Sequence, residues 1–238
     1  MVSKRTPRRR TYPHSRRKKR NIPVEHSSFH LLPPQRYIIL LDLDHTLIHS
    51  LPISCRVAES RGEKRIVLSQ HGMCTYIRPF MKSFMQSLFK NFRVGVWTAG
   101  TTDYANQILP HLMTSSQRKQ LVTFLSRDRN NMRSFVDPLR GSVVAAPHIQ
   151  GTMGKSVYLL CQTEPFRHYI QPTKTLLIDD LQENRMLNPH NMIHAPMYYK
   201  TSRKQTPDRF LQQLRLWTQK LSTHFPQDIR SIPKPLFQ

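Results

Sequence analysis

The sequence has few acidic side chains, few cysteines and no long apolar run. Its 238 residues include 14 Asp and Glu against 37 Lys and Arg, which gives a formal net charge of +23. Three cysteines are few and odd in number, which argues against a disulfide framework and for a reducing compartment. No apolar run approaches the roughly 18 residues that a membrane-spanning helix needs, and no segment repeats. The length suits one α/β domain with a tail.

The basic side chains are concentrated at the start of the chain. Residues 1–20 contain ten Lys and Arg and no acid, and prolines recur through residue 34. Because like charges repel and prolines interrupt helices, we predict that residues 1–35 form a disordered basic arm. Such an arm is typical of a nuclear-localisation signal and is a candidate for nucleic-acid contact. A solvated tail without a receptor and a mitochondrial presequence are the alternatives, although prolines suit the latter poorly.

The rest of the chain is also basic, because subtracting the ten from the 37 leaves 27 basic against 14 acidic side chains. A basic surface favours acidic partners.

Two carboxylates lie two residues apart directly after an apolar run. The run is Tyr37-Ile38-Ile39-Leu40-Leu41, and Asp42-Leu43-Asp44-His45-Thr46 follows it. Its length and composition predict a buried parallel strand. Side chains at i and i+2 of a strand point the same way, so Asp42 and Asp44 can converge on one ligand at the strand's carboxyl end. One carboxylate can act as nucleophile and metal ligand while the other transfers protons.

Two later apolar segments also end in polar side chains. Residues 94–97 precede Thr98 and Ala99, and residues 175–178 precede the pair Asp179-Asp180. Each pattern predicts a strand that delivers polar groups to the same edge of a sheet. The remaining pattern predicts a hairpin over the site within residues 50–77, helices near 79–90 and 101–113, a strand at 121–125 and a loop-rich region at 127–153.

These segments resemble, in order, the motifs of the haloacid-dehalogenase superfamily. Asp42–Thr46 resembles the first of these motifs, in the form that is found in the RNA polymerase II carboxy-terminal-domain phosphatases and their small-phosphatase and Dullard-like relatives. Arg78-Pro79, Thr98-Ala99, Tyr104-Ala105 and Asp179-Asp180 agree with later motifs of that family. The resemblance implies an α/β, haloacid-dehalogenase-like Rossmannoid fold, with a central parallel sheet flanked by helices, small hairpin or loop insertions and no large cap. It covers roughly residues 36–221, so we expect a catalytic domain at 36–222 and a C-terminal tail at 223–238.

The resemblance implies a Mg²⁺-dependent protein serine/threonine phosphatase. Asp42 would attack phosphorus to form an aspartyl-phosphate, and Asp44 would protonate the leaving group and then take a proton from water. The ion would lie between Asp42, the backbone carbonyl of Asp44, and Asp180, while Asp179 would support the metal's waters or a basic neighbour. The alternative for the pair Asp179-Asp180 is a helix cap.

Thr98 would donate its hydroxyl to a phosphate oxygen, helped by backbone N–H groups such as that of Ala99. The alternative role for Thr98 is that of a helix cap. The family's phosphate-neutralising lysine corresponds best to Lys155, since residues 155–160 are similar to the family's Lys-Asp-Leu-x-x-Leu. Ser156 replaces the Asp, and the gap to Asp179 is longer than the family's by roughly two helical turns. A surface lysine is the alternative, with Lys174 as the second candidate.

A capless, basic domain favours extended, acidic, multiply phosphorylated segments, and the resemblance implies the phosphorylated RNA polymerase II tail as a nuclear substrate. The alternative function is a phosphatase-fold binding module that has lost turnover and recognises acidic protein or nucleic acid. A rival chemistry is the C-x₅-R spacing of cysteine phosphatases, matched by Cys55 with Arg61 and by Cys161 with Arg167. Both loops contain Glu and lack Gly, so we interpret these matches as coincidental.

Overall fold

The computed structural model describes residues 37–58, 64–127, 148–149, 152–163, 166–200, 207–224 and 226–237. The expected arm at residues 1–35 lies outside these ranges, as does most of the loop-rich region. No helix in the described ranges is long and apolar enough to cross a membrane. The division of the chain at residues 35 and 222 stays a prediction.

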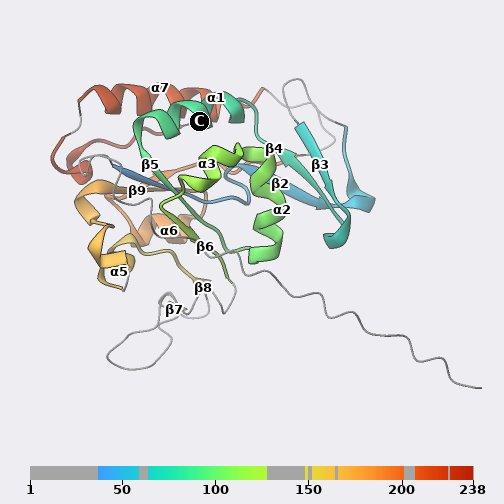
Figure 1. Ribbon diagram of the computed structural model, residues 1–238, viewed down its shortest axis with the longest axis horizontal. Helices are drawn as coiled ribbons and strands as arrows, with labels where there is room; N and C mark the ends of the chain where they lie inside the picture. Colours follow the sequence, from blue (N-terminus) through green and yellow to red (C-terminus); the bar gives the residue numbers. More distant parts are fainter. Residues whose placement is uncertain are drawn as a thin grey trace, which may run out of the picture. The chain divides into compact units, whose positions relative to one another are not determined.

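A five-stranded parallel sheet forms the centre of the fold (Figure 1), as the resemblance implies. In spatial order its strands are β10 (Met192–His194), β9 (Thr175–Asp179), β1 (Ile38–Leu41), β5 (Arg93–Trp97) and β6 (Thr123–Leu125). The chain leaves β1 toward β5 on one side and returns later to β9 on the other. The carboxyl ends of β1 and β9 therefore form a topological switch point, the place where open α/β sheets bind ligands.

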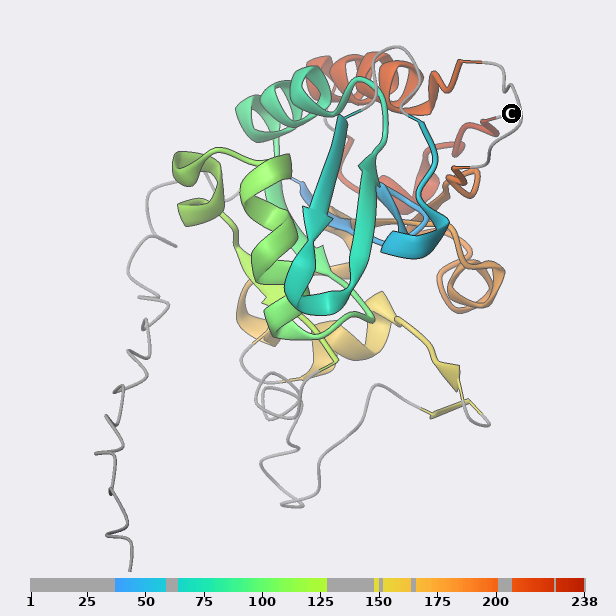
Figure 2. The same ribbon diagram turned by 90° about the vertical axis from the view of Figure 1, so that its right-hand side faces the viewer.

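Helices cover both faces of this sheet. Ile39 and Leu41 of β1 belong to the core shared with α1 (Met81–Asn91), α2 (Thr102–Leu112) and α7 (Phe210–Thr223). Figures 1 and 2 show α1 and α7 side by side on one face and α5 (Val157–Gln162) with α6 (Gln182–Leu187) on the other. Because both faces of β1 are covered, its apolar run does not alternate with polar residues.

A three-stranded antiparallel sheet is inserted between β1 and α1. Its order is β2 (Ile48–Pro52), β4 (Met73–Ile77) and β3 (Lys64–Leu68). The last two strands form the predicted hairpin, whose turn contains η3 (Ser69–His71) and Gly72 at φ 61°, a left-handed conformation that glycine adopts without strain. Figure 2 shows the hairpin beside α2, where the Gln107 amide donates to Gln70 Oε1 at 3.1 Å.

The segment after α7 contributes to the main core. Ile229 is fully buried there, and the rings of Phe210 and Phe237 lie 5.0 Å apart. The other described elements are short: η2 (Ile53–Cys55), α3 (Ser115–Lys119), β7 (His148–Ile149), β8 (Thr152–Met153), η5 (Phe166–His168), η6 (Pro172–Lys174) and η7 (Ile229–Ser231).

Candidate active site

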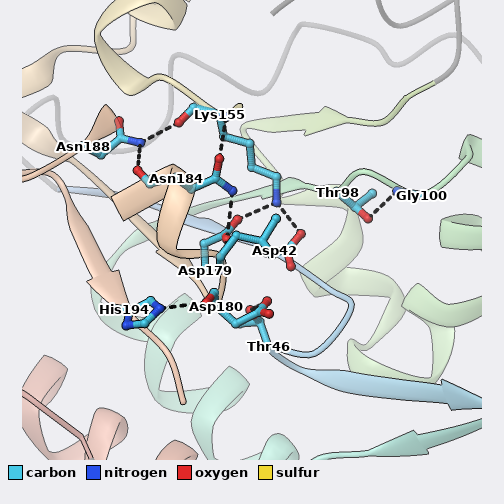
Figure 3. A network of polar contacts seen from close by, with 11 residues as sticks. Asp42, Thr46, Thr98, Gly100, Lys155, Asp179, Asp180, Asn184, Asn188 and His194 are labelled. Carbon is cyan, nitrogen blue, oxygen red and sulfur yellow. Dashed lines mark hydrogen bonds and ion pairs between the residues drawn. The ribbon is translucent and has the colours of Figure 1, made fainter. Parts of the chain in front are cut away.

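Three buried carboxylates meet at the carboxyl ends of β1 and β9 (Figure 3). Asp42 follows β1, Asp179 ends β9, and Asp180 comes next; one oxygen from each lies within 4.8 Å of the others. Strand pairing brings them together, because Leu41 pairs with Ile178 and the N–H of Asp42 donates to the Ile178 carbonyl at 3.0 Å. Two acidic motifs more than 130 residues apart in the sequence therefore form one site.

Lys155 supplies a buried positive charge to this site. Its ammonium donates to Asp179 Oδ2 at 2.6 Å and also to Asp42 Oδ1. Burial alone would lower the pKa of Lys155, but the two carboxylates raise it above its ordinary value, so the amine stays protonated. The reading of Lys155 as a surface lysine is wrong, since the residue is only 4% exposed. Lys174 instead lies before the amino end of β9, where it donates to the Pro226 carbonyl at 3.4 Å.

Two asparagines hold the backbone around Lys155. Asn184 of α6 accepts from the Lys155 N–H at 2.8 Å and donates to Asp179 Oδ1 at 2.9 Å. Asn188 donates to the Lys155 carbonyl at 2.5 Å and accepts from the Val157 N–H at 2.8 Å. Both asparagines are buried, so these bonds replace water that the peptide groups would otherwise need. The sequence alone assigned neither asparagine a role.

Asp180 has one satisfied and one unsatisfied carboxylate oxygen. The Thr46 hydroxyl donates to Oδ1 at 2.9 Å, whereas the buried Oδ2 has no hydrogen-bond partner among the described residues. Burial raises the pKa of Asp180, and the Thr46 hydrogen bond opposes that shift. An uncompensated buried carboxylate oxygen is costly, and a hard cation with oxygen ligands would satisfy it.

The charge count also fits a divalent cation. Asp42, Asp179 and Asp180 against Lys155 leave a formal charge of −2 in the buried site. Burial is the largest effect on Asp42 and raises its pKa to about 7; Lys155 lowers it, and the neighbouring acids raise it further. A bound cation would favour the carboxylate form of Asp42, which is the nucleophilic form. The carboxylates present therefore suit Mg²⁺.

Asp44 lies apart from the three buried carboxylates. Its Oδ1 accepts from the Tyr104 hydroxyl at 2.6 Å, and its side chain is partly exposed. The tight turn that follows places His45 at φ 59°, with its N–H donating to the Ile48 carbonyl at 2.7 Å. Asp42 and Asp44 thus have different surroundings, one beside an ammonium and one beside a phenol, as two different chemical roles require. The sequence did not predict the Tyr104 contact.

Thr98 follows β5, the strand that pairs with β1, so it lies at the same edge of the sheet as Asp42 (Figure 3). Its Oγ1 accepts from the Gly100 N–H at 3.0 Å, which leaves the hydroxyl proton for another acceptor. The reading of Thr98 as a helix cap is wrong, because Thr101 caps α2 by accepting from the Tyr104 N–H at 3.3 Å. Ala99 is exposed in the turn between β5 and α2.

Arg78 contacts the backbone next to the carboxylate site. Its guanidinium is buried, donates to the Thr46 carbonyl at 2.8 Å and pairs with Asp208 at 2.9 Å. It also lies over the Phe210 ring at 4.3 Å. Because Thr46 in turn bonds Asp180, Arg78 connects the start of α7 to the carboxylate site.

The cysteine chemistry has little structural support. Burial raises the pKa of Cys161 on α5 to about 12, so its thiol is protonated at neutral pH and is a poor nucleophile. Cys55 is exposed, and its expected partner Arg61 lies outside the described residues.

The parallel sheet, with acids and a buried lysine at its carboxyl edge, is consistent with the resemblance to the haloacid-dehalogenase type of phosphatase. The family model of the NLI interacting factor-like phosphatases matches residues 37–230. The chain therefore belongs to that family and is classed with its phosphoprotein phosphatases.

Relatives come from viruses and vertebrates. The putative CTD phosphatase-like protein 355R of Invertebrate iridescent virus 3 is 29% identical over 176 residues, covering 69% of this chain and 86% of the relative. Protein 037R of Frog virus 3 (isolate Goorha) is 23% identical over 204 residues, with the same coverages. The ubiquitin-like domain-containing CTD phosphatase 1 of Danio rerio is 23% identical over 181 residues, covering 76% of this chain and 48% of the relative. The chain thus spans about half the length of that vertebrate relative.

Among solved structures, that of Fcp1, an essential RNA polymerase II CTD phosphatase, is similar. It has 20% sequence identity and a TM-score of 0.46, and the match covers 79% of this chain and 50% of that chain.

Proposed function

We propose that the chain is a Mg²⁺-dependent protein serine/threonine phosphatase that acts through an aspartyl-phosphate on Asp42. The observation that supports this most directly is the Lys155 ammonium, which contacts both Asp42 and Asp179 at a cluster of three buried acids. The arrangement supplies a nucleophile, a charge to neutralise the transferred group and ligands for a cation.

Each side chain has a separate task in this proposal. Asp42 attacks phosphorus while the bond to the Ser or Thr oxygen of the substrate breaks. Asp44 protonates that oxygen, then takes a proton from the water that hydrolyses the aspartyl-phosphate. Thr98 and the N–H of Ala99 bind phosphate oxygens, and Lys155 neutralises their charge.

Asp42, the backbone carbonyl of Asp44, and Asp180 would hold Mg²⁺. The unpartnered Oδ2 of Asp180 and the formal charge of −2 support this assignment. When bound, the ion would supply positive charge, which would reduce the repulsion between an anionic nucleophile and an anionic ester. Asp179 is left to orient Lys155 through their 2.6 Å contact.

The proposed substrate is the phosphorylated RNA polymerase II tail or a similar acidic phosphoprotein in the nucleus. The names of the viral and vertebrate relatives and the net charge of +23 support this class of substrate. The alternative of a binding module without turnover is not favoured, because the four acids and a buried lysine are all present.

The test is turnover of p-nitrophenyl phosphate and of a phosphoserine peptide in metal-free buffer, then with added Mg²⁺. We expect EDTA to abolish turnover of both, Mg²⁺ to restore it, and beryllium fluoride to inhibit by imitating the phosphoryl group on Asp42. Turnover that survives exhaustive chelation but disappears on thiol alkylation would support the cysteine chemistry instead.

A further inference from the structure

A chain of hydroxyl groups ends on Asp44. The Tyr104 hydroxyl of α2 donates to Asp44 Oδ1 at 2.6 Å. The same phenol oxygen lies 2.6 Å from Ser50 Oγ on β2, which lies 2.7 Å from Thr75 Oγ1 on β4. Ser50 and Thr75 are directly paired across the antiparallel strands, so this link belongs to the inserted sheet. Three separate elements therefore converge on the proposed proton-transfer group.

The Asp44 carboxylate fixes the direction of every hydrogen bond in this chain of hydroxyl groups. An ionised carboxylate only accepts, so Tyr104 must give its single hydroxyl proton to Asp44. Ser50 must then donate to Tyr104, and Thr75 must donate to Ser50. A row of donors that point one way toward a negative charge is reinforced by polarisation along the row.

The position of the Tyr104 ring is also tightly restricted. A Cβ at residue 100 would lie 2.8 Å from Tyr104 Cδ1, so glycine at this position is what leaves room for the ring. The His71 ring also packs against it in a T-shaped arrangement, with centroids 5.9 Å apart. Thr75 is fully buried, which anchors the far end of the chain. The phenol is therefore held in one place by packing as well as by hydrogen bonds.

We propose that Tyr104, supported by Ser50 and Thr75, is a positioning residue for proton transfer: it holds Asp44 Oδ1, so that Oδ2 is the oxygen that carries the transferred proton. This inference rests on the proposed function and adds to it the residues that orient the acid.

In the first half of the reaction, the Asp44 Oδ2–H proton goes to the substrate oxygen as its bond to phosphorus breaks and the bond from Asp42 forms, so the substrate leaves as an alcohol. In the second half, a proton of the attacking water returns to Oδ2 as the bond from Asp42 breaks and inorganic phosphate forms. Tyr104 keeps its own proton throughout, because its hydroxyl donates that proton to Asp44 Oδ1.

The experiment compares two leaving groups in the variant Tyr104→Phe of the full chain, with Mg²⁺ present. A serine alkoxide is a poor leaving group that needs protonation, whereas p-nitrophenolate leaves with little help. The value of kcat/KM reports the steps up to formation of the aspartyl-phosphate, so it isolates the first proton transfer. We expect kcat/KM to fall about tenfold for a phosphoserine peptide, part of the roughly 10²–10⁴-fold that general acid–base catalysis supplies. For p-nitrophenyl phosphate we expect a fall of less than about threefold.

The matched control is Tyr37→Phe, which also removes a tyrosine hydroxyl. Tyr37 lies just before the amino end of β1, and its hydroxyl donates to the Pro226 carbonyl. This control should change neither value. Ser50→Ala removes the hydroxyl that donates to Tyr104, so kcat/KM for the phosphoserine peptide should again fall selectively, but by less. This variant tests the proposal if Tyr104→Phe fails to fold. Equal losses for the two substrates, or no loss for either, would overturn the positioning role while the proposed function stands. Absence of Mg²⁺-dependent turnover in the unaltered protein would overturn both.

Discussion

Asp42 and Asp44 differ in their neighbours more than in their chemistry. Asp42 is buried against an ammonium, whereas Asp44 is partly exposed and accepts from a phenol. In the proposed mechanism, the ammonium and a bound cation would keep Asp42 as an anion that can attack phosphorus, and the outer position of Asp44 would suit exchange of protons with substrate and water.

The first prediction is that Asp42→Asn abolishes turnover and leaves the fold intact. The amide is not a nucleophile for phosphorus, but Lys155 keeps its ion pair with Asp179, so the buried charge stays paired. We expect no measurable kcat and a nearly unchanged unfolding midpoint in urea. Asp44→Asn is the companion variant, in which formation and breakdown of the intermediate should fall together. Near-normal turnover of purified Asp42→Asn would exclude the aspartyl-phosphate on this residue.

The second prediction concerns Lys155, which is replaced by a methionine of similar length. Lys155→Met leaves Asp42 and Asp179 buried without a counter-charge, so the free energy of unfolding should fall by about 3–5 kcal/mol. Turnover should fall by about 10²–10³-fold, as for loss of a charge-stabilising donor.

The double variant Lys155→Met/Asp179→Asn separates the two effects of this lysine. Removing one of the two unpaired buried charges should recover part of the free energy of unfolding, measured in urea, but none of the turnover. Recovery of turnover would mean that Lys155 serves only to neutralise Asp179.

At this scale the sequence identified acids better than their partners. Asp42, Asp44 and Asp179-Asp180 stand out because each follows an apolar run at a fixed spacing. Lys155 rested on a partial match in which Ser156 replaces the family's Asp, so it was only a candidate until the fold placed it beside Asp42. The Tyr104 contact with Asp44 joins a helix to a loop 60 residues away, and no local pattern contains that information.

Among the elements, strands with a continuous apolar run were predicted most accurately. β1, β5 and β9 lie where their runs indicate, because strands buried on both faces have few polar positions. Element ends were less accurate: the helix expected from residue 79 begins at Met81, since Phe80 adopts φ 66°. The short helix α6 was not predicted as a helix, since six residues give too few turns for a periodic pattern.

The third prediction tests the connection between α7 and the carboxylate site. Arg78→Met removes the buried guanidinium that donates to the Thr46 carbonyl and pairs with Asp208. It should lower the free energy of unfolding by about 3–5 kcal/mol, because the buried acceptors lose their donor. Since Thr46 holds Asp180, the folded variant should also need more Mg²⁺ for half-maximal turnover.

The matched control for Arg78→Met is Arg230→Met, which breaks a contact of similar geometry with Asp228 on the surface. That change should leave both the unfolding curve and the Mg²⁺ requirement unaltered, because water screens an exposed pair. An unchanged Mg²⁺ requirement in Arg78→Met would show that the guanidinium stabilises the fold without positioning Asp180.

At the scale of the whole molecule, charge is the property that sequence alone predicts best, since it needs no knowledge of the fold. The excess of 37 basic over 14 acidic side chains favours acidic phosphoproteins, and association driven by such charge weakens as salt screens it.

The fourth prediction concerns substrate choice. Phosphoserine peptides that contain Ser-Pro should be cleaved better than phosphotyrosine peptides, and acidic flanking residues should lower KM. Raising the salt concentration from 0.05 to about 0.5 M should raise KM while changing kcat little, because screening acts on association. A KM independent of salt would exclude the basic charge as the source of recognition.

The last prediction separates the arm from the catalytic domain by deleting residues 1–20. Every proposed catalytic, phosphate-binding and metal-binding residue lies between Asp42 and Asp180, so turnover of a phosphoserine peptide should barely change. The deletion removes ten Lys and Arg, the clusters typical of a nuclear-localisation signal, so a fluorescent fusion should shift out of the nucleus. Replacing the same ten residues by Gln is the control for chain length and should give the same shift. A truncated protein that stayed nuclear but lost peptide turnover would assign the arm to the active site and contradict the division of the chain at residue 35.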